Sequence, residues 1–283
     1  MISQILRFQK NEITESVIYD HLSLQEKDPA NREVLAQISQ DEERHYQFWK
    51  KHSHQEVGVN WPMVMKYLWI ARIFGLTFAV KLMENGEQSA KISYGEIEKI
   101  VPEVKTVIAD EHAHEQKLIA MIDEERLRYT GSVVLGLSDA LVELTGVLAG
   151  LTLALPQARV IATVGLITGI AAALSMAASE YFSTQSENHT NPVKAAIYTG
   201  IVYMVVVLVL VAPFLFLKNV FGALALTLAG AVFIIFLFTY YMAVVKDQPF
   251  KKYFTEMTVI SLGVAALTFV IGYFVRKFLG VEI

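Results

Sequence analysis

The sequence predicts an all-α protein in two parts, a four-helix bundle followed by a five-span transmembrane helical domain. The chain of 283 residues is 54% hydrophobic and its mean hydropathy is +0.41, whereas soluble proteins are usually about 45–50% apolar. Charge is concentrated at one end, because residues 132–283 hold only 8 of the 24 Lys/Arg and 7 of the 28 Asp/Glu. Apolar residues recur with helical spacing in the charged part and form long runs in the rest.

The first predicted domain comprises residues 1–130, in which 21 Asp/Glu outnumber 16 Lys/Arg. Apolar residues three and four positions apart predict four helices there. Asn31 is expected to cap the second helix, and Pro62 and Pro102 are expected in the first turns of the third and fourth. Four helices with short connections are typical of a bundle. The predicted ranges are 2–24, 32–49, 62–92 and 102–127.

A Glu-x-x-His motif occurs twice, in "DEERH" at 41–45 and in "DEHAH" at 110–114. Residues three apart lie on one helix face, so Glu42 with His45, and Glu111 with His114, each present a carboxylate and an imidazole in one direction. One such pair alone is more often part of a solvated face. Two pairs, on the second and fourth predicted helices, instead favour a di-metal centre.

The other two predicted helices supply the carboxylates that such a centre needs. In di-iron and di-manganese bundles of the ferritin-like type, each of these helices contributes a Glu. The first helix offers Glu12, with Glu15 as a less favoured alternative, and the third offers Glu84 and Glu87. Carboxylate oxygens with imidazole nitrogens suit Fe or Mn. The predicted metal ligands are Glu12, Glu42, His45, Glu84, Glu87, Glu111 and His114.

The second predicted domain, residues 131–283, contains five apolar segments long enough to cross a bilayer. A helix needs about 20 mainly apolar residues to span the hydrocarbon core. One such segment could be a buried helix of a soluble protein, but five in succession predict an integral membrane protein. The predicted spans are 133–155, 160–179, 195–217, 219–245 and 257–275.

Polar residues within the first two spans are candidates for a transport pathway, because ionisable groups are costly in a membrane and usually face a pathway or a partner. These candidates are Asp139, Glu143, Met176 and Glu180. For Glu143 and Glu180 a position near a span end is the alternative, and for Met176 it is ordinary packing. The small residues Gly136, Ala140, Gly146 and Gly150 predict close span packing and a homodimer.

Residues 1–127 resemble the rubrerythrin branch of the ferritin-like superfamily. Glu12 lies seven positions before Tyr19, as the first-helix ligand and its following tyrosine do in that branch. Glu84 and Glu87 match the doubled carboxylate of its third helix. The resemblance implies a ferritin-like di-iron or di-manganese bundle.

Residues 131–283 resemble the vacuolar iron transporter family. The stretch "GLSDALVELTGVLAGL" at 136–151 is similar to its first span, and "LITGIAAALSMAASEYFSTQSE" at 166–187 to its second. Ala140 and Ser179 depart from glycines of the family pattern. The resemblance implies that Asp139 and Met176 occupy intramembrane metal positions and that the protein is a homodimer, with Glu143 as an additional carboxylate. The whole architecture resembles bacterial membrane-bound ferritin-like iron exporters.

These patterns together predict a proton-coupled transporter that exports Fe²⁺, or Mn²⁺, from the cytoplasm. The bundle would capture, sense or oxidise the metal, so ferroxidase or peroxidase activity is an open question. The alternative is a membrane-tethered di-iron peroxidase or oxidase. The expected partners are the lipid bilayer, the metal ions and protons, and no nucleic acid. A modest excess of Lys/Arg on one side of the spans favours a cytoplasmic N-terminal domain. The resemblance to bacterial exporters implies the plasma membrane of a prokaryote.

Overall fold

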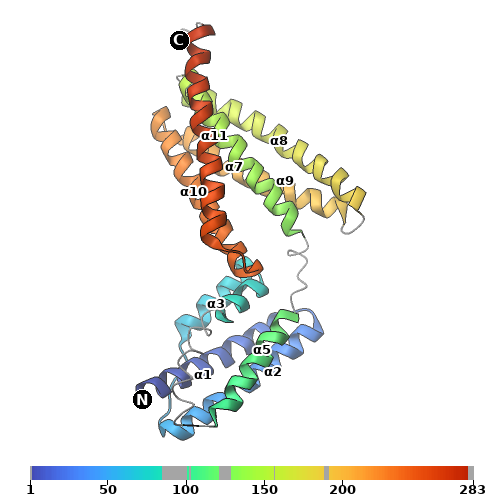
Figure 1. Ribbon diagram of the computed structural model, residues 1–283, viewed down its shortest axis with the longest axis vertical. Coiled ribbons are helices and arrows are strands. Elements are labelled where there is room, and N and C mark those ends of the chain that lie inside the picture. The colour runs from blue at the N-terminus through green and yellow to red at the C-terminus, as the bar shows by residue number, and fades with distance from the viewer. Residues whose placement is uncertain are drawn as a thin grey trace. The chain divides into compact units, whose positions relative to one another are not determined.

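The computed structural model describes residues 2–84, 101, 103–120, 129–155, 157–187 and 191–279 (Figure 1). Within these residues all regular secondary structure is helical. The chain divides into two compact units, unit 1 from Met1–Asp123 and unit 2 from Glu124–Ile283. The prediction of an all-helical chain is confirmed.

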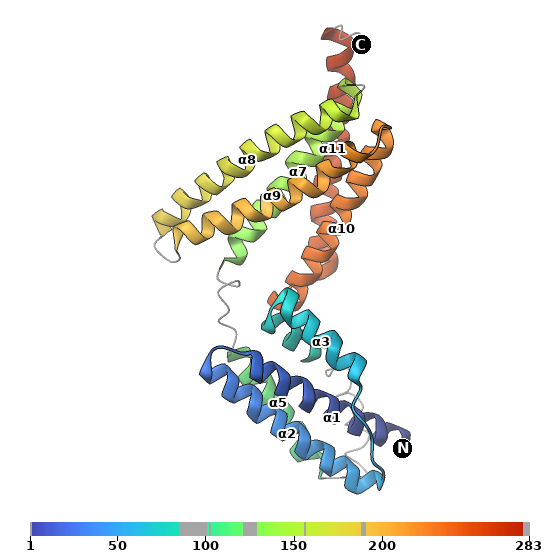
Figure 2. The same cartoon turned by 180° about the vertical axis from the view of Figure 1, so that it is seen from behind.

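Unit 1 is built on an antiparallel pair of long helices that lie side by side in both views (Figures 1 and 2). Polar side chains of both helices lie next to a third helix, α5 (Val104–Ala120). The elements of unit 1 are α1 (Ile2–Gln25), α2 (Pro29–Ser53), α3 (Trp61–Phe74) and α5 (Val104–Ala120). The chain is also helical over residues 76–84.

The second helix begins earlier than its sequence pattern predicts. Asp28, not Asn31, is its N-cap, and the Asp28 carboxylate accepts hydrogen bonds from the backbone N–H groups of Ala30 and Asn31. Pro29 follows in the first turn, where its fixed φ suits a helix and its missing N–H costs no bond. The expectation that Asn31 caps α2 is therefore wrong, because a carboxylate three residues earlier already fills that role.

The predicted third helix is interrupted at Gly75. The sequence predicts one helix over residues 62–92, but α3 ends at Phe74, and Gly75 has φ 98°, a conformation that side chains with a Cβ rarely adopt. The chain is helical again from residue 76 to 84, and residues 85–92 lie outside the described part. Pro62 does lie in the first turn of α3, as predicted. Pro102 lies outside the described residues.

Two apolar clusters form the core of unit 1. The smaller one packs Ile5, Phe8 and Val104 around Trp49, whose side chain is fully buried. The larger one joins all the helical segments, and its members are Ile18, Tyr19, Leu22, Leu35, Ile38, Val64, Tyr67, Val80, Met83 and Leu118. Polar side chains of α1, α2 and α5 are enclosed near these clusters and form the site described below.

The described part of unit 2 consists of five apolar helices, each long enough to cross a membrane. This confirms the five predicted spans, although each helix is longer than predicted at one end or at both. Asn191 and Asn219 cap the third and fourth of them through side-chain oxygens. The helices are α7 (Thr130–Ala154), α8 (Ala158–Glu187), α9 (Pro192–Phe216), α10 (Val220–Lys246) and α11 (Phe250–Leu279).

Small residues let α7 approach its neighbours within the same chain. A Cβ added to Gly136 would lie 2.7 Å from the carbonyl oxygen of Thr199 on α9, and one added to Gly272 on α11 would lie 2.2 Å from the carbonyl oxygen of Gly150. The Thr268 hydroxyl on α11 also donates to the Gly146 carbonyl at 2.7 Å. Close span packing is thus present, but these glycines serve contacts inside one chain and supply no separate argument for a homodimer.

Candidate metal centre

Three helices of unit 1 bring a buried group of carboxylates and an imidazole together. Glu12 comes from α1, Glu42 and His45 from α2, and Glu111 from α5. Each offers one ligand atom, and these four atoms lie within 4.8 Å of one another. All four residues are at most 5% exposed. This metal-ligand cluster, as we call these four residues, can hold a metal ion.

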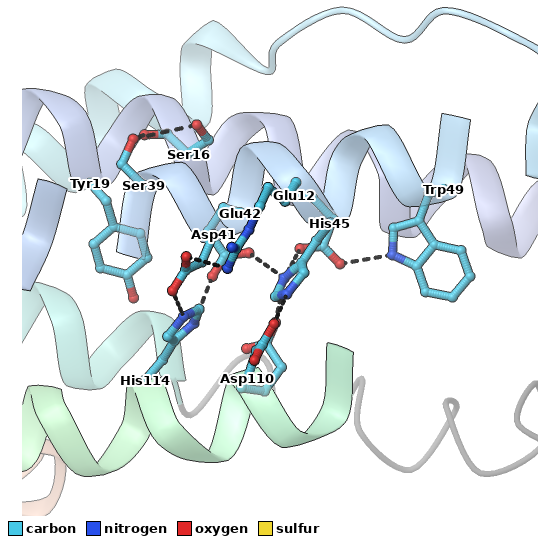
Figure 3. Close-up of polar contacts among 12 residues, drawn as sticks. Glu12, Ser16, Tyr19, Ser39, Asp41, Glu42, His45, Trp49, Asp110 and His114 are labelled. Carbon is cyan, nitrogen blue, oxygen red and sulfur yellow. Dashed lines mark hydrogen bonds and ion pairs between the residues drawn. The ribbon is translucent and has the colours of Figure 1, made fainter. Parts of the chain in front are cut away.

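His45 lies at the centre of the metal-ligand cluster (Figure 3). Its Nδ1 is 3.3 Å from Glu42 Oε2, 3.3 Å from Glu111 Oε1 and 3.5 Å from Glu12 Oε2. His114 lies beside the cluster, with its Nδ1 3.1 Å from Glu42 Oε1. The two oxygens of Glu42 therefore face two different imidazoles, which is a suitable position for a carboxylate that bridges two metal ions.

Two aspartates form a crossed arrangement behind the histidines. Asp41 Oδ2 lies 2.9 Å from His114 Nε2, and Asp110 Oδ2 lies 3.2 Å from His45 Nε2 (Figure 3). Each Asp precedes the Glu of one motif and contacts the His of the other. An Nε2–H that donates to Asp leaves Nδ1 to act as a ligand, and such carboxylate partners orient metal-binding histidines.

Sequence analysis missed both aspartates, although a signal was present. Asp stands directly before Glu in "DEERH" and again in "DEHAH". Adjacent helix positions point about 100° apart, so the pattern alone does not place this Asp in the site. The contact depends on α2 and α5 lying next to each other. Asp41 is also held by Gln37, whose amide donates to it at 2.8 Å, and by an ion pair with Arg44.

Aromatic donors hold two of the predicted ligands. Trp49 Nε1 donates to Glu12 Oε1 at 3.0 Å, and the Tyr19 hydroxyl donates to Glu84 Oε1 at 3.2 Å. Glu84 is buried but does not belong to the metal-ligand cluster of four. Glu87 lies outside the described residues. The structure thus brings five of the seven predicted ligands together: four form the cluster, and His114 lies against Glu42. Glu84 is positioned by its hydrogen bond from Tyr19.

Burial and crowded negative charge change the protonation of these groups. Burial raises the pKa of Glu12 to about 7, and the charge of Glu42 contributes to the rise. Burial, with the charges of Glu42, Glu12 and Glu111, also raises the pKa of Glu15 well above its ordinary value. Glu15 therefore lies close to the same charges as Glu12 but outside the group of four.

Burial alone would lower the pKa of the two histidines, but neighbouring carboxylates raise it. Burial by itself lowers the pKa of His45, but the carboxylates of Glu111, Glu12 and Glu42 outweigh it and raise that pKa. Burial likewise lowers the pKa of His114, and Glu42 and Asp41 more than offset it. Protons on these groups balance the clustered negative charge. A divalent cation would balance it as well and displace the protons, as metal binding to deprotonated ligands requires. The donor set fits a metal ion.

In unit 2 the two carboxylates of the first span lie one helical turn apart on α7. Asp139 is half-buried, and Glu143 is exposed on the isolated chain. The hydroxyl of Tyr203, a fully buried residue of α9, donates to Glu143 Oε2 at 2.7 Å. Glu143 also lines a groove between α7 and α11 with Gly146 and Gly150. The sequence pattern does not single out Tyr203, because a tyrosine in an apolar span, which also holds Tyr198, has no distinguishing pattern.

The second pair of predicted pathway residues has different surroundings. Glu180 Oε1 accepts hydrogen bonds from the Ser132 hydroxyl at 2.6 Å and from the Thr184 hydroxyl at 3.4 Å. Ser132 lies in the first turn of α7 and Glu180 in the last third of α8, so this contact is near the helix ends. Met176 is half-buried and packs against the apolar core of unit 2. The structure therefore gives Glu143 and Glu180 separate partners.

Residues 130–191 match the family model of the VIT family. The matched part comprises α7, α8 and the connection to α9, and it contains Asp139, Glu143, Met176 and Glu180. A search of curated proteins found no match. The VIT match implies a membrane transporter of a metal ion, iron or manganese. With five apolar helices, it supports the resemblance drawn from the first two spans and indicates an integral membrane protein.

Proposed function

We propose that this protein exports Fe²⁺, with Mn²⁺ as the alternative cargo, from the cytoplasm in exchange for protons. Unit 1 is proposed to be a ferritin-like, rubrerythrin-type di-metal bundle that captures, senses or oxidises the metal. One observation carries this proposal: a single chain combines a buried carboxylate and imidazole cluster with two carboxylates on an apolar helix of a VIT-matched segment. Each half of that combination handles a divalent cation.

The residues of the bundle have distinct roles in this proposal. Glu12, Glu42, His45 and Glu111 would hold the metal, with His114 beside Glu42. Asp41 and Asp110 keep the histidine Nδ1 atoms directed at the carboxylates. Glu84 and Glu87 are proposed to complete the di-metal set. Two metal ions held there would supply redox chemistry, while the protein controls their access and the protonation of their ligands.

The spans supply a second set of anionic groups. A dication that enters an apolar helical domain loses water, and carboxylates such as Asp139 and Glu143 can replace part of that hydration. The same groups can carry protons, which is the chemical basis for exchanging a metal ion against protons. Tyr203 holds Glu143 in place through its hydroxyl. Met176 and Glu180 are proposed to continue the path on α8.

We further propose a homodimer in the plasma membrane of a prokaryote, with unit 1 in the cytoplasm. The orientation rests on the Lys/Arg distribution around the spans. The dimer rests on the exposed position of Glu143 within an apolar helix, because a carboxylate in that position needs a polar neighbour or water. A species that is monomeric by light scattering in detergent, and still active in liposomes, would refute the dimer.

A membrane-tethered di-iron peroxidase or oxidase is the second candidate. The observation in its favour is that the metal-ligand cluster is complete within unit 1 and needs no residue from the spans. Against it, an anchor needs only one span and no intramembrane carboxylates. The rubrerythrin-type peroxidase also receives electrons through a Cys-ligated iron centre, and this chain has no Cys.

Metal flux distinguishes the two candidates. We would reconstitute the protein and Asp139→Asn in sealed liposomes and measure uptake of Fe²⁺, Mn²⁺ and Zn²⁺ under an imposed pH gradient. Because Asn keeps the volume of Asp but lacks its charge, flux should fall close to that of empty liposomes while peroxide turnover stays unchanged. Absence of flux in the native protein, with peroxide turnover present, would refute the transporter. Unchanged flux in Asp139→Asn would remove this residue from the path.

A further inference from the structure

The surface of α3 carries an apolar stripe that the metal site does not use. Trp61, Met65, Trp69 and Ile73 follow one another at intervals of four, and each is between 52% and 59% exposed. Side chains four apart lie on one helix face. We call these four residues the α3 stripe. The opposite face of α3 is held in the core of unit 1 by Val64 and Tyr67, so the helix is apolar on two sides.

The α3 stripe stands out from the rest of unit 1. Among the described residues of that unit, the other exposed large apolar side chains are Ile2, Leu24 and Phe74, and Phe74 also belongs to α3. Neither α2 nor the described part of α5 exposes any. Single exposed apolar residues are ordinary, but a contiguous stripe on a polar domain marks an interaction surface. A 14-residue helix is about 21 Å long, so the stripe covers a substantial area.

The charges that flank the stripe indicate an anionic partner. Lys66 and Arg72 are exposed on α3, and the helix contains no Asp or Glu. This contrasts with the excess of acidic residues over the first domain as a whole. Helices that lie in a membrane interface combine Trp and aliphatic residues with Lys/Arg at the polar boundary. Trp is especially suited to that boundary, because its large ring is apolar and its N–H remains a donor.

We propose that α3 is an interfacial helix that inserts the α3 stripe into the anionic surface of the bilayer in which unit 2 is embedded. The chain itself supplies the proximity, because unit 1 is covalently joined to a first span that begins at Thr130. Such a tether gives the stripe a high effective concentration of lipid headgroups. Apolar burial holds Trp61 and Trp69, and Lys66 and Arg72 pair with lipid phosphates.

The tryptophans of this protein make the proposal directly measurable in the full chain. There are three, Trp49, Trp61 and Trp69, so unit 2 has none. Trp49 is fully buried in the bundle and serves as an internal reference. We would reconstitute the protein in vesicles of phosphatidylcholine, alone or mixed with phosphatidylglycerol, using lipids with brominated acyl chains that quench nearby tryptophan. Part of the emission should be quenched, and more so with phosphatidylglycerol.

Conservative variants assign that quenching to the stripe. Trp61→Phe with Trp69→Phe leaves only Trp49, and the lipid-dependent quenching should be lost. Met65→Glu with Ile73→Glu keeps every Trp but places charge in the stripe, so quenching should fall and the emission should shift to longer wavelength. Lys66→Glu with Arg72→Glu should abolish the extra effect of phosphatidylglycerol. The matched control is Lys51→Glu, a charge reversal at an exposed position of α2, which should leave it unchanged.

Three outcomes would overturn the proposal. Emission of the native protein that brominated lipid does not quench would show that the stripe faces water or protein. Equal quenching with and without phosphatidylglycerol would refute the anionic surface as the partner. Loss of a dimer in Met65→Glu with Ile73→Glu, without any lipid quenching in the native protein, would assign the stripe to a second copy of the chain. Metal binding by each variant confirms that unit 1 remains folded in these experiments.

Discussion

The two units use the same acidic side chain in opposite settings. In unit 1 the carboxylates of Glu12, Glu42 and Glu111 are buried, and imidazoles and an indole contact them. In unit 2 Glu143 is exposed on an apolar helix and has one phenol as its donor. A site that retains a cation benefits from many preorganised partners. A site through which a cation passes must bind it weakly enough to release it.

This difference shows where each unit can tolerate change. Unit 1 concentrates charge where the protein supplies compensating protons and donors, so the removal of one carboxylate leaves others within 4.8 Å. Unit 2 holds few ionisable groups in a helical domain that is otherwise apolar, so the loss of one removes much of the local charge.

The largest effect on unit 1 is expected from Glu42→Ala combined with Glu111→Ala. Glu42 contacts both histidines and Glu111 contacts His45, so their removal takes away the two carboxylates at the centre of the site. The native full-length protein should bind about two Fe²⁺ or Mn²⁺ in the bundle, and the double variant should bind none there. Equilibrium titration followed by elemental analysis measures this. Full occupancy in the variant would remove the proposed site.

A smaller loss is expected from Asp41→Asn combined with Asp110→Asn. These residues contact the histidines through Nε2 and are not members of the metal-ligand cluster. Loss of such orienting partners typically weakens metal affinity by about 10–100-fold. Titration should show weaker binding with unchanged stoichiometry. Gln47→Ala, a change at an exposed position of α2, is the control and should bind as the native protein does. Native affinity in the Asp double variant would show that the crossed contacts have no role.

The stability of the metal-free protein and its affinity for metal should change in opposite directions as pH rises. Glu12 has its pKa raised from 4.5 to about 7, so between these values the folded protein binds more protons than the unfolded chain. Without metal, the free energy of unfolding should therefore fall as pH rises through that window. Metal affinity should rise over the same window, by about tenfold per pH unit for each proton displaced.

Chemical denaturation and metal titration at a series of pH values measure the two trends. Glu12→Gln is the control, because an amide does not titrate, and its unfolding free energy should lose this part of the slope. The raised pKa values of His45 and His114 extend the dependence of metal affinity toward higher pH. Affinity that does not change with pH would contradict the proton displacement inferred for the cluster.

The smallest effect is expected from Tyr203→Phe in unit 2. This variant keeps the ring packed and removes only the hydroxyl that donates to Glu143. A hydrogen bond to a charged group contributes about 1.5–3 kcal/mol, and we expect the exposed carboxylate to recover part of it from water, so metal flux should fall by no more than about tenfold. Tyr198→Phe on the same helix, where Tyr198 stacks on Tyr129, is the control and should preserve flux. Equal flux in all three proteins would remove Tyr203 from the path.

The sequence by itself determined the all-helical class, the five membrane spans and the residues from which the metal-ligand cluster is drawn, but not the break at Gly75. These features depend on local periods: the helical repeat places Glu42 with His45, and Glu111 with His114, on single faces, and bilayer thickness sets the length of the apolar runs. The match of residues 130–191 to the VIT family rests on the same local sequence.

Only the tertiary structure decided which side chains from different helices meet. The crossing of Asp41 to His114 and Asp110 to His45, the bond from Tyr203 to Glu143, and the use of Gly136 and Gly150 inside one chain all join residues far apart in sequence. Helical periodicity gives the direction of a side chain but not its neighbour on another helix. That neighbour depends on how the helices pack, and packing is a property of the whole fold.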